Sequence, residues 1–244
     1  MSGANARSLR VVGPGRAGGA LASALDRVGW QIAEPVRRGQ PLAGAAAQVD
    51  LLVISTPDAA ITEVAAAIEP DPHAVVVHLA GSLGLDVLMP HPRVGALHPL
   101  VSLPSTEVGA ERLVDAAWFG VAGDGLVQAV VADLGGRCFT IADADRARYH
   151  AAACIASNHL VALLGQVERV AAAVNVPFAA YLGLARHTVD NVERLGPAAA
   201  LTGPVARGDW ATVARHLQAI DSREHAAYEA MADLARRLVD ETTA

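Results

Sequence analysis

The chain has 244 residues, of which 52% are hydrophobic and 4% aromatic, with a net charge of −6 and a pI near 5.8. This balance is typical of one large or two modest folded domains, and it argues against nucleic acid as the main partner. No charge-free apolar run of about 18 residues is present, which excludes a membrane span, and residues 1–7 lack the apolar core of a signal peptide.

Cysteine and lysine usage limits the chemistry further. Cys138 and Cys154 provide neither a disulfide framework nor metal-ligand spacing, and the histidines show no metal spacing either. We therefore expect no bound metal and a cytoplasmic location. All nineteen basic residues are arginine. Schiff-base chemistry, pyridoxal phosphate anchoring and a Walker-type phosphate lysine are excluded, because each needs a lysine amine.

A glycine-rich turn, Gly13–Gly18, lies between an apolar strand that begins at Leu9 and a helix predicted over 16–28. This G-x-G-x-x-G spacing is typical of dinucleotide binding. The first glycine permits the turn, the second lets a pyrophosphate approach the backbone, and the third lets the helix pack on the sheet. The helix N-terminus favours phosphate. The alternative is a glycine turn without a ligand. The predicted cofactor contacts here are Gly13, Pro14, Gly15, Arg16, Ala17 and Gly18.

The end of the second predicted strand, residues 30–36, indicates which dinucleotide binds. An acid there would bind the ribose 2′-hydroxyl of NAD, whereas an arginine would accommodate the 2′-phosphate of NADP. Glu34 favours NAD, but it falls before the strand end, and Arg37 and Arg38 lie beyond it. The pattern favours NADP(H), with Arg37 as the phosphate ligand. The alternative is that both arginines are solvated loop charges.

Strands and helices then alternate, which predicts an α/β fold with a parallel, doubly wound sheet. The strand over 49–54 ends in Ser55, Thr56 and Pro57, which we expect over the cofactor, and Asp58 is a predicted N-cap for a helix over 59–68. Further strands are predicted over 75–79, 93–98, 118–121 and 137–141, with a helix over 125–134.

The alternation ends near residue 142, and no convincing strand follows. The predicted domains are therefore a Rossmann domain over 1–142 and an all-α domain over 143–244. Helices are predicted over 144–173, 177–195, 210–220 and 222–240, the last two capped by Asp209 and Ser222.

The helix around His150 carries the densest set of polar groups in the second domain. At about 100° per residue His150, Cys154 and Ser157 share one face, and Asn158 lies close by. His150 could donate the proton that a carbonyl oxygen takes up during hydride transfer, with Ser157 and Asn158 orienting the substrate. The alternative is that these groups satisfy one another, or nearby backbone, in a packed helix.

Further candidates lie in loops and at strand ends. The loop over 202–209 suits a carboxylate, with Arg207 as a bidentate partner and Thr202 beside it. The alternative is a structural turn. His98, at a strand end, could reach the nicotinamide pocket or could bond local backbone. Ser82 follows a glycine at a strand end and could contact cofactor or substrate, whereas His78 is more typical of a structural residue.

Two sets of motifs resemble known families. Residues 13–18, Arg37 and the segment 53–58 resemble the N-terminal domain of the 6-phosphogluconate dehydrogenase superfamily, which includes ketopantoate reductase, pyrroline-5-carboxylate reductase and prephenate dehydrogenase. Residues 149–159 and 200–209, with Leu79–Ser82 and Leu97–Pro99, resemble domain of unknown function 2520 joined to a Rossmann-like domain.

The resemblance implies an oxidoreductase that is a homodimer through its helical domain, and some members are thought to reduce ketopantoate. Related reductases use a lysine as proton donor, which this chain lacks, so His150 is the expected substitute. The leading hypothesis is an NADPH-dependent reductase of a small 2-oxo acid. The alternatives are a non-catalytic NADP(H) sensor and a deazaflavin-linked NADP oxidoreductase.

Overall fold

The structure is a computed structural model that describes residues 6–243, with side chains to residue 241. Most of the segment considered for a signal peptide, residues 1–5, lies outside the described residues. The chain forms two compact units, 1–157 and 158–244. The predicted boundary lay at residue 142, but the first unit also includes the helix that follows its last strand. Within residues 6–243, no helix is long and apolar enough to span a bilayer.

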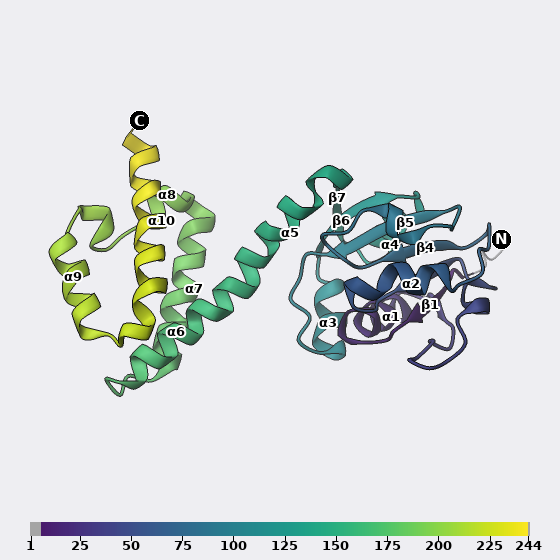
Figure 1. The fold of residues 1–244 in the computed structure, drawn as a ribbon, viewed down its shortest axis with the longest axis horizontal. Helices are drawn as coiled ribbons and strands as arrows, with labels where there is room; N and C mark the ends of the chain where they lie inside the picture. Colours follow the sequence, from purple (N-terminus) through teal and green to yellow (C-terminus); the bar gives the residue numbers. More distant parts are fainter. Residues whose placement is uncertain (1–5, 244) are drawn as a thin grey trace. The chain divides into compact units, whose positions relative to one another are not determined.

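The first unit is built on a seven-stranded sheet with the order β2-β1-β3-β4-β5-β6-β7 (Figure 1). After β1 the chain first forms β2, which pairs with one side of β1, and then β3, which pairs with the other side. The strand order therefore reverses at β1. In open α/β sheets, ligands bind outside the carboxyl ends of the strands at such a reversal. The strands are β1 (Ser8–Val12), β2 (Gln31–Ile32), β3 (Leu51–Ile54), β4 (Val75–His78), β5 (Val94–Pro99), β6 (Trp118–Gly123) and β7 (Arg137–Thr140).

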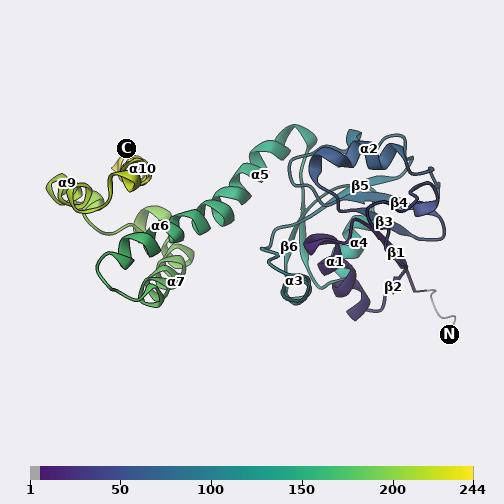
Figure 2. The same cartoon turned by 60° about the horizontal axis from the view of Figure 1, so that its bottom comes forward.

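Helices cover both faces of this sheet, which explains why β3 is apolar at every position and β4 at every position except His78. Alternate residues of β3, such as Leu51 and Val53, face α1 (Arg16–Arg27) and α4 (Leu126–Asp133). Leu52 and Ile54 face the opposite core, which includes α2 (Ile61–Ala66). Figure 2 shows α2 on one face and α1 and α4 on the other. The predicted doubly wound α/β class is confirmed.

Three details of this unit differ from the prediction. The sheet is mixed, because β6 pairs with β5 in the antiparallel direction. β2 is two residues long, and beyond Pro35 only the bridge between Val36 and Val12 continues the pairing. A helix absent from the prediction, α3 (Thr106–Leu113), begins at Ser105, whose side chain accepts a hydrogen bond from the N–H of Val108 at 3.3 Å.

The predicted long helix after residue 144 is interrupted. It consists of α5 (Arg146–Cys154), a π-helical turn over Ile155–His159 and α6 (Leu160–Ala172). A π turn is wider than an α turn, so the regular 100° spacing does not continue through it. The spacing used to predict that His150 and Ser157 share a face therefore does not apply unchanged beyond Cys154.

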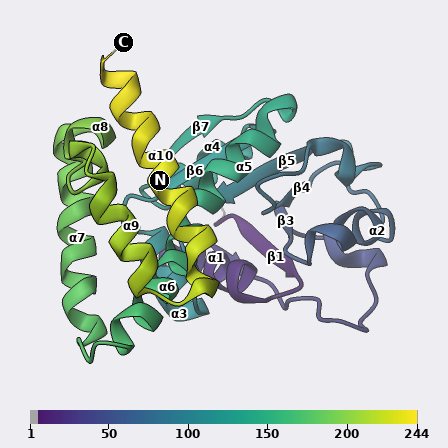
Figure 3. The ribbon, with the colours of Figure 1, turned by 60° about the vertical axis from the view of Figure 1, so that its left-hand side comes forward.

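The second unit is helical, and residues 158–243 contain no strand (Figure 3). After α6 come α7 (Phe178–Leu195), α8 (Pro197–Ala200), α9 (Trp210–Ala219) and α10 (His225–Thr243). Asp209 caps α9 as predicted, accepting a hydrogen bond from the N–H of Thr212 at 3.0 Å. The other two predicted caps were wrong. Asp58 makes no side-chain cap bond, and Asp221 rather than Ser222 caps the turn before α10.

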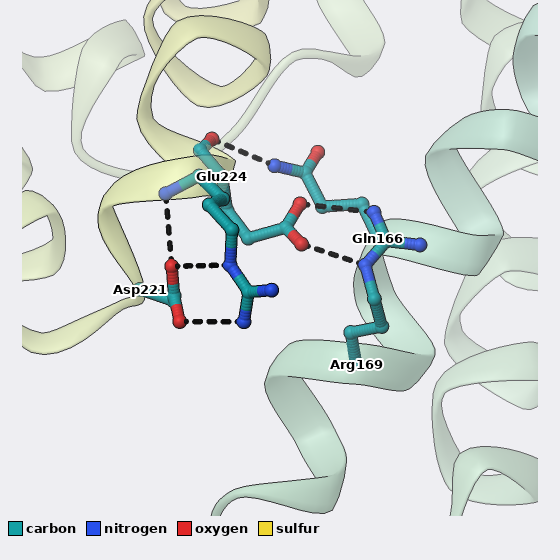
Figure 4. Close-up of polar contacts among 5 residues, drawn as sticks. Gln166, Arg169, Asp221 and Glu224 are labelled. Carbon is teal, nitrogen blue, oxygen red and sulfur yellow. Dashed lines mark hydrogen bonds and ion pairs between the residues drawn. The ribbon is translucent and has the colours of Figure 1, made fainter.

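Polar contacts fasten α6 to the turn before α10 (Figure 4). The guanidinium of Arg169 donates to both carboxylate oxygens of Glu224, at 2.6 and 3.0 Å. The amide of the buried Gln166 donates to the backbone carbonyl of Glu224 at 2.9 Å. Asp221 accepts two hydrogen bonds from the side chain of Arg223. These contacts set the spacing of two helices whose apolar faces are sparsely buried.

Candidate functional site

The turn after β1 has the geometry that its glycines predict. Gly13 has a φ of 78°, in the left-handed region that favours glycine, and its N–H donates to the carbonyl of Val36 at 2.9 Å. A Cβ on Gly18 would lie 2.7 Å from the Cβ of Ser55 and 2.8 Å from a methyl carbon of Val11. The missing side chain of Gly18 therefore allows α1 to pack on the sheet.

Gly15 faces open space instead. A Cβ there would meet no heavy atom closer than the carbonyl oxygen of Gly13 at 4.0 Å. Gly15 is also the N-cap of α1, and no side chain caps the helix there. The turn thus offers an uncovered backbone surface next to a helix N-terminus, which suits a phosphate. Two hollows of about 420 and 500 Å³ adjoin it, and both are lined by Gly15, Ser55, Thr56 and Pro57.

The first hollow extends toward the end of the second strand. Arg37 and Arg38 line it, and Glu34 does not. Within residues 6–243 neither arginine side chain has a hydrogen bond or an ion pair. Gly13 is bonded to the carbonyl of Val36, so the following residue, Arg37, is held beside the glycine turn. The second hollow extends to the end of β4, where Leu79 and Ala80 line it together with Arg16 and Ala17.

Thr56 has an unused polar group at the junction of the two hollows. Its Oγ1 is buried and has no hydrogen-bond partner in the described structure. A buried hydroxyl without a partner is costly unless a ligand or water completes it. Together with the open backbone at Gly15, this group fits a bound dinucleotide.

A polar cluster lies at the carboxyl ends of β4 and β5. Nδ1 of His98 is 2.6 Å from the hydroxyl of Tyr149, and the two rings meet edge to face. The ring of His150 is perpendicular to that of His98, with centroids 5.7 Å apart. Both imidazoles lie against Gly81, because a Cβ there would be 2.5 Å from Cδ2 of His150 and 2.9 Å from Nε2 of His98. Gly81 directly follows Ala80, which lines the second hollow.

Burial, the neighbouring His150 and the guanidinium of Arg146 together lower the pKa of His98 to about 4. Burial raises the pKa of Tyr149 above its usual value. His98 is therefore neutral and Tyr149 is protonated at neutral pH. His78 is fully buried and contacts the carbonyl of Gly84 through Nε2 at 3.1 Å, and burial lowers its pKa.

Sequence reasoning missed Arg146 and gave Tyr149 no role. Arg146 is 1% exposed, and its Nε donates to Asp143 at 2.9 Å. Its two terminal nitrogens are buried without partners. Burial acts to raise the pKa of Asp143, but the hydrogen bond from Arg146 outweighs this effect and holds the pKa below its usual value. In a sequence, an arginine in the first turn of a polar helix looks solvated, so nothing signalled this burial.

The other predicted site residues are more scattered. Ser82 is partly buried in the turn after β4 and directly follows Gly81, the glycine that the two histidines contact. Ser157 and Asn158 are on the π turn, on either side of the division between the two units. Thr202 and Arg207 are exposed in the second unit, before α9. Nε2 of His150 is 3.9 Å from the sulfur of Cys154, one turn further along α5.

Residues 120–235 match a family model. It is Domain of unknown function (DUF2520). The matched segment begins in β6, includes the helix of Tyr149 and His150, and ends within α10. The predicted resemblance to DUF2520 is confirmed. No curated protein matches the chain.

Solved structures share the whole fold at low sequence identity. A Bacteroides fragilis protein, provisionally named an NADP oxidoreductase, is 20% identical with a TM-score of 0.79, over 95% of this chain and 98% of that one. A reductive aminase of Aspergillus terreus, solved with NADPH and ethyl levulinate, is 16% identical (TM-score 0.71, 97% and 95%). Pyrroline carboxylate reductase of Plasmodium falciparum, solved with NADP, is 13% identical (TM-score 0.63, 96% and 98%). The family model begins at residue 120, whereas these structures also match the fold of the residues before it.

Proposed function

We propose that the protein is an NADPH-dependent oxidoreductase that reduces a small 2-oxo acid, with a ketopantoate-like substrate as the first choice. The observation that carries the proposal is the open glycine turn between two hollows. One is lined by Arg37 and Arg38, and the other reaches Ala80, the residue before the glycine that the two histidines contact. Similar folds solved with NADPH or NADP support the cofactor.

The residues of the first hollow would distinguish NADP from NAD. Arg37 and Arg38 would hold the 2′-phosphate, since they line the hollow and have no competing carboxylate among the described residues. The backbone of Gly13–Gly18 and the hydroxyl of Thr56 would hold the pyrophosphate. Ser55 and Pro57 would line its path toward the second hollow.

Bound NADPH would supply the hydride to the carbonyl carbon of the substrate. The carbonyl oxygen must then gain a proton, and the chain has no lysine to provide it. We assign this step to His150, whose ring lies against Gly81 at the end of β4. Substrate contacts by Ser157, Asn158, Ser82, Thr202 and Arg207 remain part of the proposal, with Arg207 as the carboxylate ligand.

The cofactor is tested by calorimetry with NADPH and NADH. Arg37→Ala should weaken binding of NADPH by tenfold or more and leave that of NADH nearly unchanged, because only NADPH has the 2′-phosphate. Arg27→Ala, at the far end of α1, is the matched control. If the protein binds neither dinucleotide at millimolar concentration, the proposal is wrong.

The reaction is tested by NADPH oxidation with a panel of 2-oxo acids that includes ketopantoate, each with and without an added amine. His150→Ala should lower kcat and leave NADPH affinity nearly intact, and unchanged turnover would remove His150 from the mechanism. Tight NADPH binding without turnover of any compound would favour the sensor alternative. Absorbance of the purified protein tests for a bound deazaflavin.

We also propose a homodimer through the helical unit. Among residues 158–241 only Gln166, Ala171 and Val213 are buried. Large apolar side chains such as Val161, Leu184 and Leu195 are each at least 59% exposed. An apolar hollow of about 690 Å³ also lies between α6, α9 and α10. A second copy that covers these surfaces would complete the core. Analytical ultracentrifugation should find a dimer at micromolar concentration, and a monomer would contradict this part of the proposal.

A further inference from the structure

The contact between His98 and Tyr149 bears on which nitrogen of the His98 ring carries the proton. A neutral imidazole carries its proton on one nitrogen, and the hydrogen bond made by that ring's other nitrogen determines which one. Nδ1 of His98 faces the Tyr149 hydroxyl at 2.6 Å, and Nε2 faces Gly81. The hydrogen bond at Nδ1 therefore determines whether Nε2, beside Gly81, is an N–H donor or an acceptor.

The surroundings of the pair favour the tyrosine as donor. The hydroxyl of Tyr149 packs against Gly120, where a Cβ would lie only 2.9 Å away, and His98 is its one hydrogen-bond partner in the described structure. The charged and titratable groups around His98 are His150 and Arg146 from α5 and His78 from β4. None of these three groups is an acid, and the nearest carboxylate bonded to them, Asp143, is paired with Arg146, so none of the three favours an imidazolium at this position. An unprotonated Nδ1 accepts a hydrogen bond from the O–H of Tyr149, and Nε2 then carries the ring's one N–H.

We propose that His98 is a fixed, neutral hydrogen-bond donor to the carbonyl oxygen of the substrate, and that Tyr149 is the positioning residue that sets its tautomer. This inference rests on the proposed function and adds a second histidine role to it. As the hydride reaches the carbonyl carbon, the C=O π electrons move to oxygen. Nε2–H of His98 stabilises the resulting charge without giving up its proton, and His150 transfers a proton to that oxygen and becomes neutral.

The two roles follow from the different surroundings of the two rings. His98, on β5, is partly buried against Gly81 and Tyr149, and its neutral form is favoured over the whole physiological range. His150 is partly exposed on α5 and touches only the weakly polar sulfur of Cys154 through Nε2. Both side chains are only partly exposed, so the two rings differ in their partners. His98 has a hydrogen-bond partner that fixes its tautomer, as a neutral donor needs, whereas His150 has no such strong partner to hold back the proton that an acid must transfer.

Two measurements on the full chain test the inference. The ¹⁵N shifts of the His98 ring should show the Nε2–H tautomer in the wild-type protein, and Tyr149→Phe should produce a mixture of tautomers. Tyr149→Phe should also lower kcat by about tenfold or more, as for partners that orient a histidine elsewhere, while the KM for NADPH changes less than twofold. His98→Ala should cost about 100- to 1,000-fold in kcat, the typical loss of one donor to an oxyanion.

The second unit provides a matched control. Nδ1 of His216 is 2.6 Å from the hydroxyl of Tyr228, with rings also edge to face, so Tyr228→Phe deletes the same kind of hydrogen bond. It should leave kcat and the His98 spectrum unchanged.

An Nδ1–H tautomer in the wild-type protein, or unchanged kcat in both Tyr149→Phe and His98→Ala, would overturn the inference. The proposed function would survive either result if the wild-type protein still reduces its substrate with NADPH. Absence of any turnover would instead overturn the proposed function and the role of His98 with it.

Discussion

The two compact units differ in how completely they bury their apolar residues. The first unit buries both faces of its sheet, and residues such as Leu25, Leu51 and Phe119 have no exposed surface. The second unit has an equally apolar sequence but buries only three residues among 158–241. A sheet covered on both faces completes a core within one chain, whereas a few helices around a shallow hollow leave theirs open. The first unit therefore has the packing of a complete domain, whereas the second leaves most of its apolar side chains exposed in the single chain, as the proposed dimer would require.

The largest expected effect contrasts two leucines. Leu25→Ala, in the fully buried face of α1, should lower the free energy of unfolding by about 2–5 kcal/mol, because it removes buried carbons and leaves a cavity. Leu184→Ala, at a residue that is 62% exposed, should cost far less in dilute protein. Denaturant unfolding measures both. A loss for Leu184→Ala that grows with protein concentration would show that a second copy buries this leucine.

Two glycines give the next largest contrast. Gly18→Val should destabilise the protein by about 1–3 kcal/mol or more, since its Cβ would collide with Ser55 and Val11. Gly183→Ala, in α7, has no heavy atom within 4 Å of the new Cβ and should stabilise by about 0.5–1 kcal/mol. Thermal unfolding monitored by circular dichroism provides the measurement. A destabilising Gly183→Ala would mean that α7 packs against something this chain alone does not provide.

The last comparison follows the stability of the protein with pH, in the presence and absence of His98. The pKa of His98 is lowered from 6.5 to about 4 in the folded protein, so between these values the unfolded chain binds a proton that the native state does not. Stability should fall as pH drops from about 6.5 to 4, with a slope of at most about 1.4 kcal/mol per pH unit from this group. Above pH 6.5 both states are neutral and the contribution is constant.

His98→Gln should flatten this part of the stability profile. Part of the slope will remain, because burial also lowers the pKa of His78. Equal profiles for wild type and His98→Gln would show that His98 is not held neutral by the fold.

The first unit was largely predictable because its signals are local. The glycine spacing, the apolar strands and the arginines after Val36 lie within short stretches of sequence, and each dictates one backbone feature. The direction of β6 was not predictable, because parallel and antiparallel strands buried on both faces look alike in sequence. The π turn was missed for a related reason, since Ile155–His159 has the composition of an ordinary helix.

The polar cluster was predictable only in part. His98 and His150 were found as separate candidates, because a histidine at a strand end and one on a polar helix are local signals. Their meeting over Gly81 depends on how α5 packs on β5, which is tertiary information. Arg146 was missed for the same reason, because its burial comes from neighbours distant in sequence.

Gly81 provides a way to sort related sequences without measuring anything. Any side chain at this position would overlap the space now taken by two imidazole rings, the shorter separation being 2.5 Å. A protein of this fold that carries alanine or serine there must have lost or moved at least one of these histidines. Glycine, the two histidines and the tyrosine should therefore be inherited or lost as a set. A single glycine codon can serve as the first marker when homologues with this chemistry are separated from those that keep only the fold.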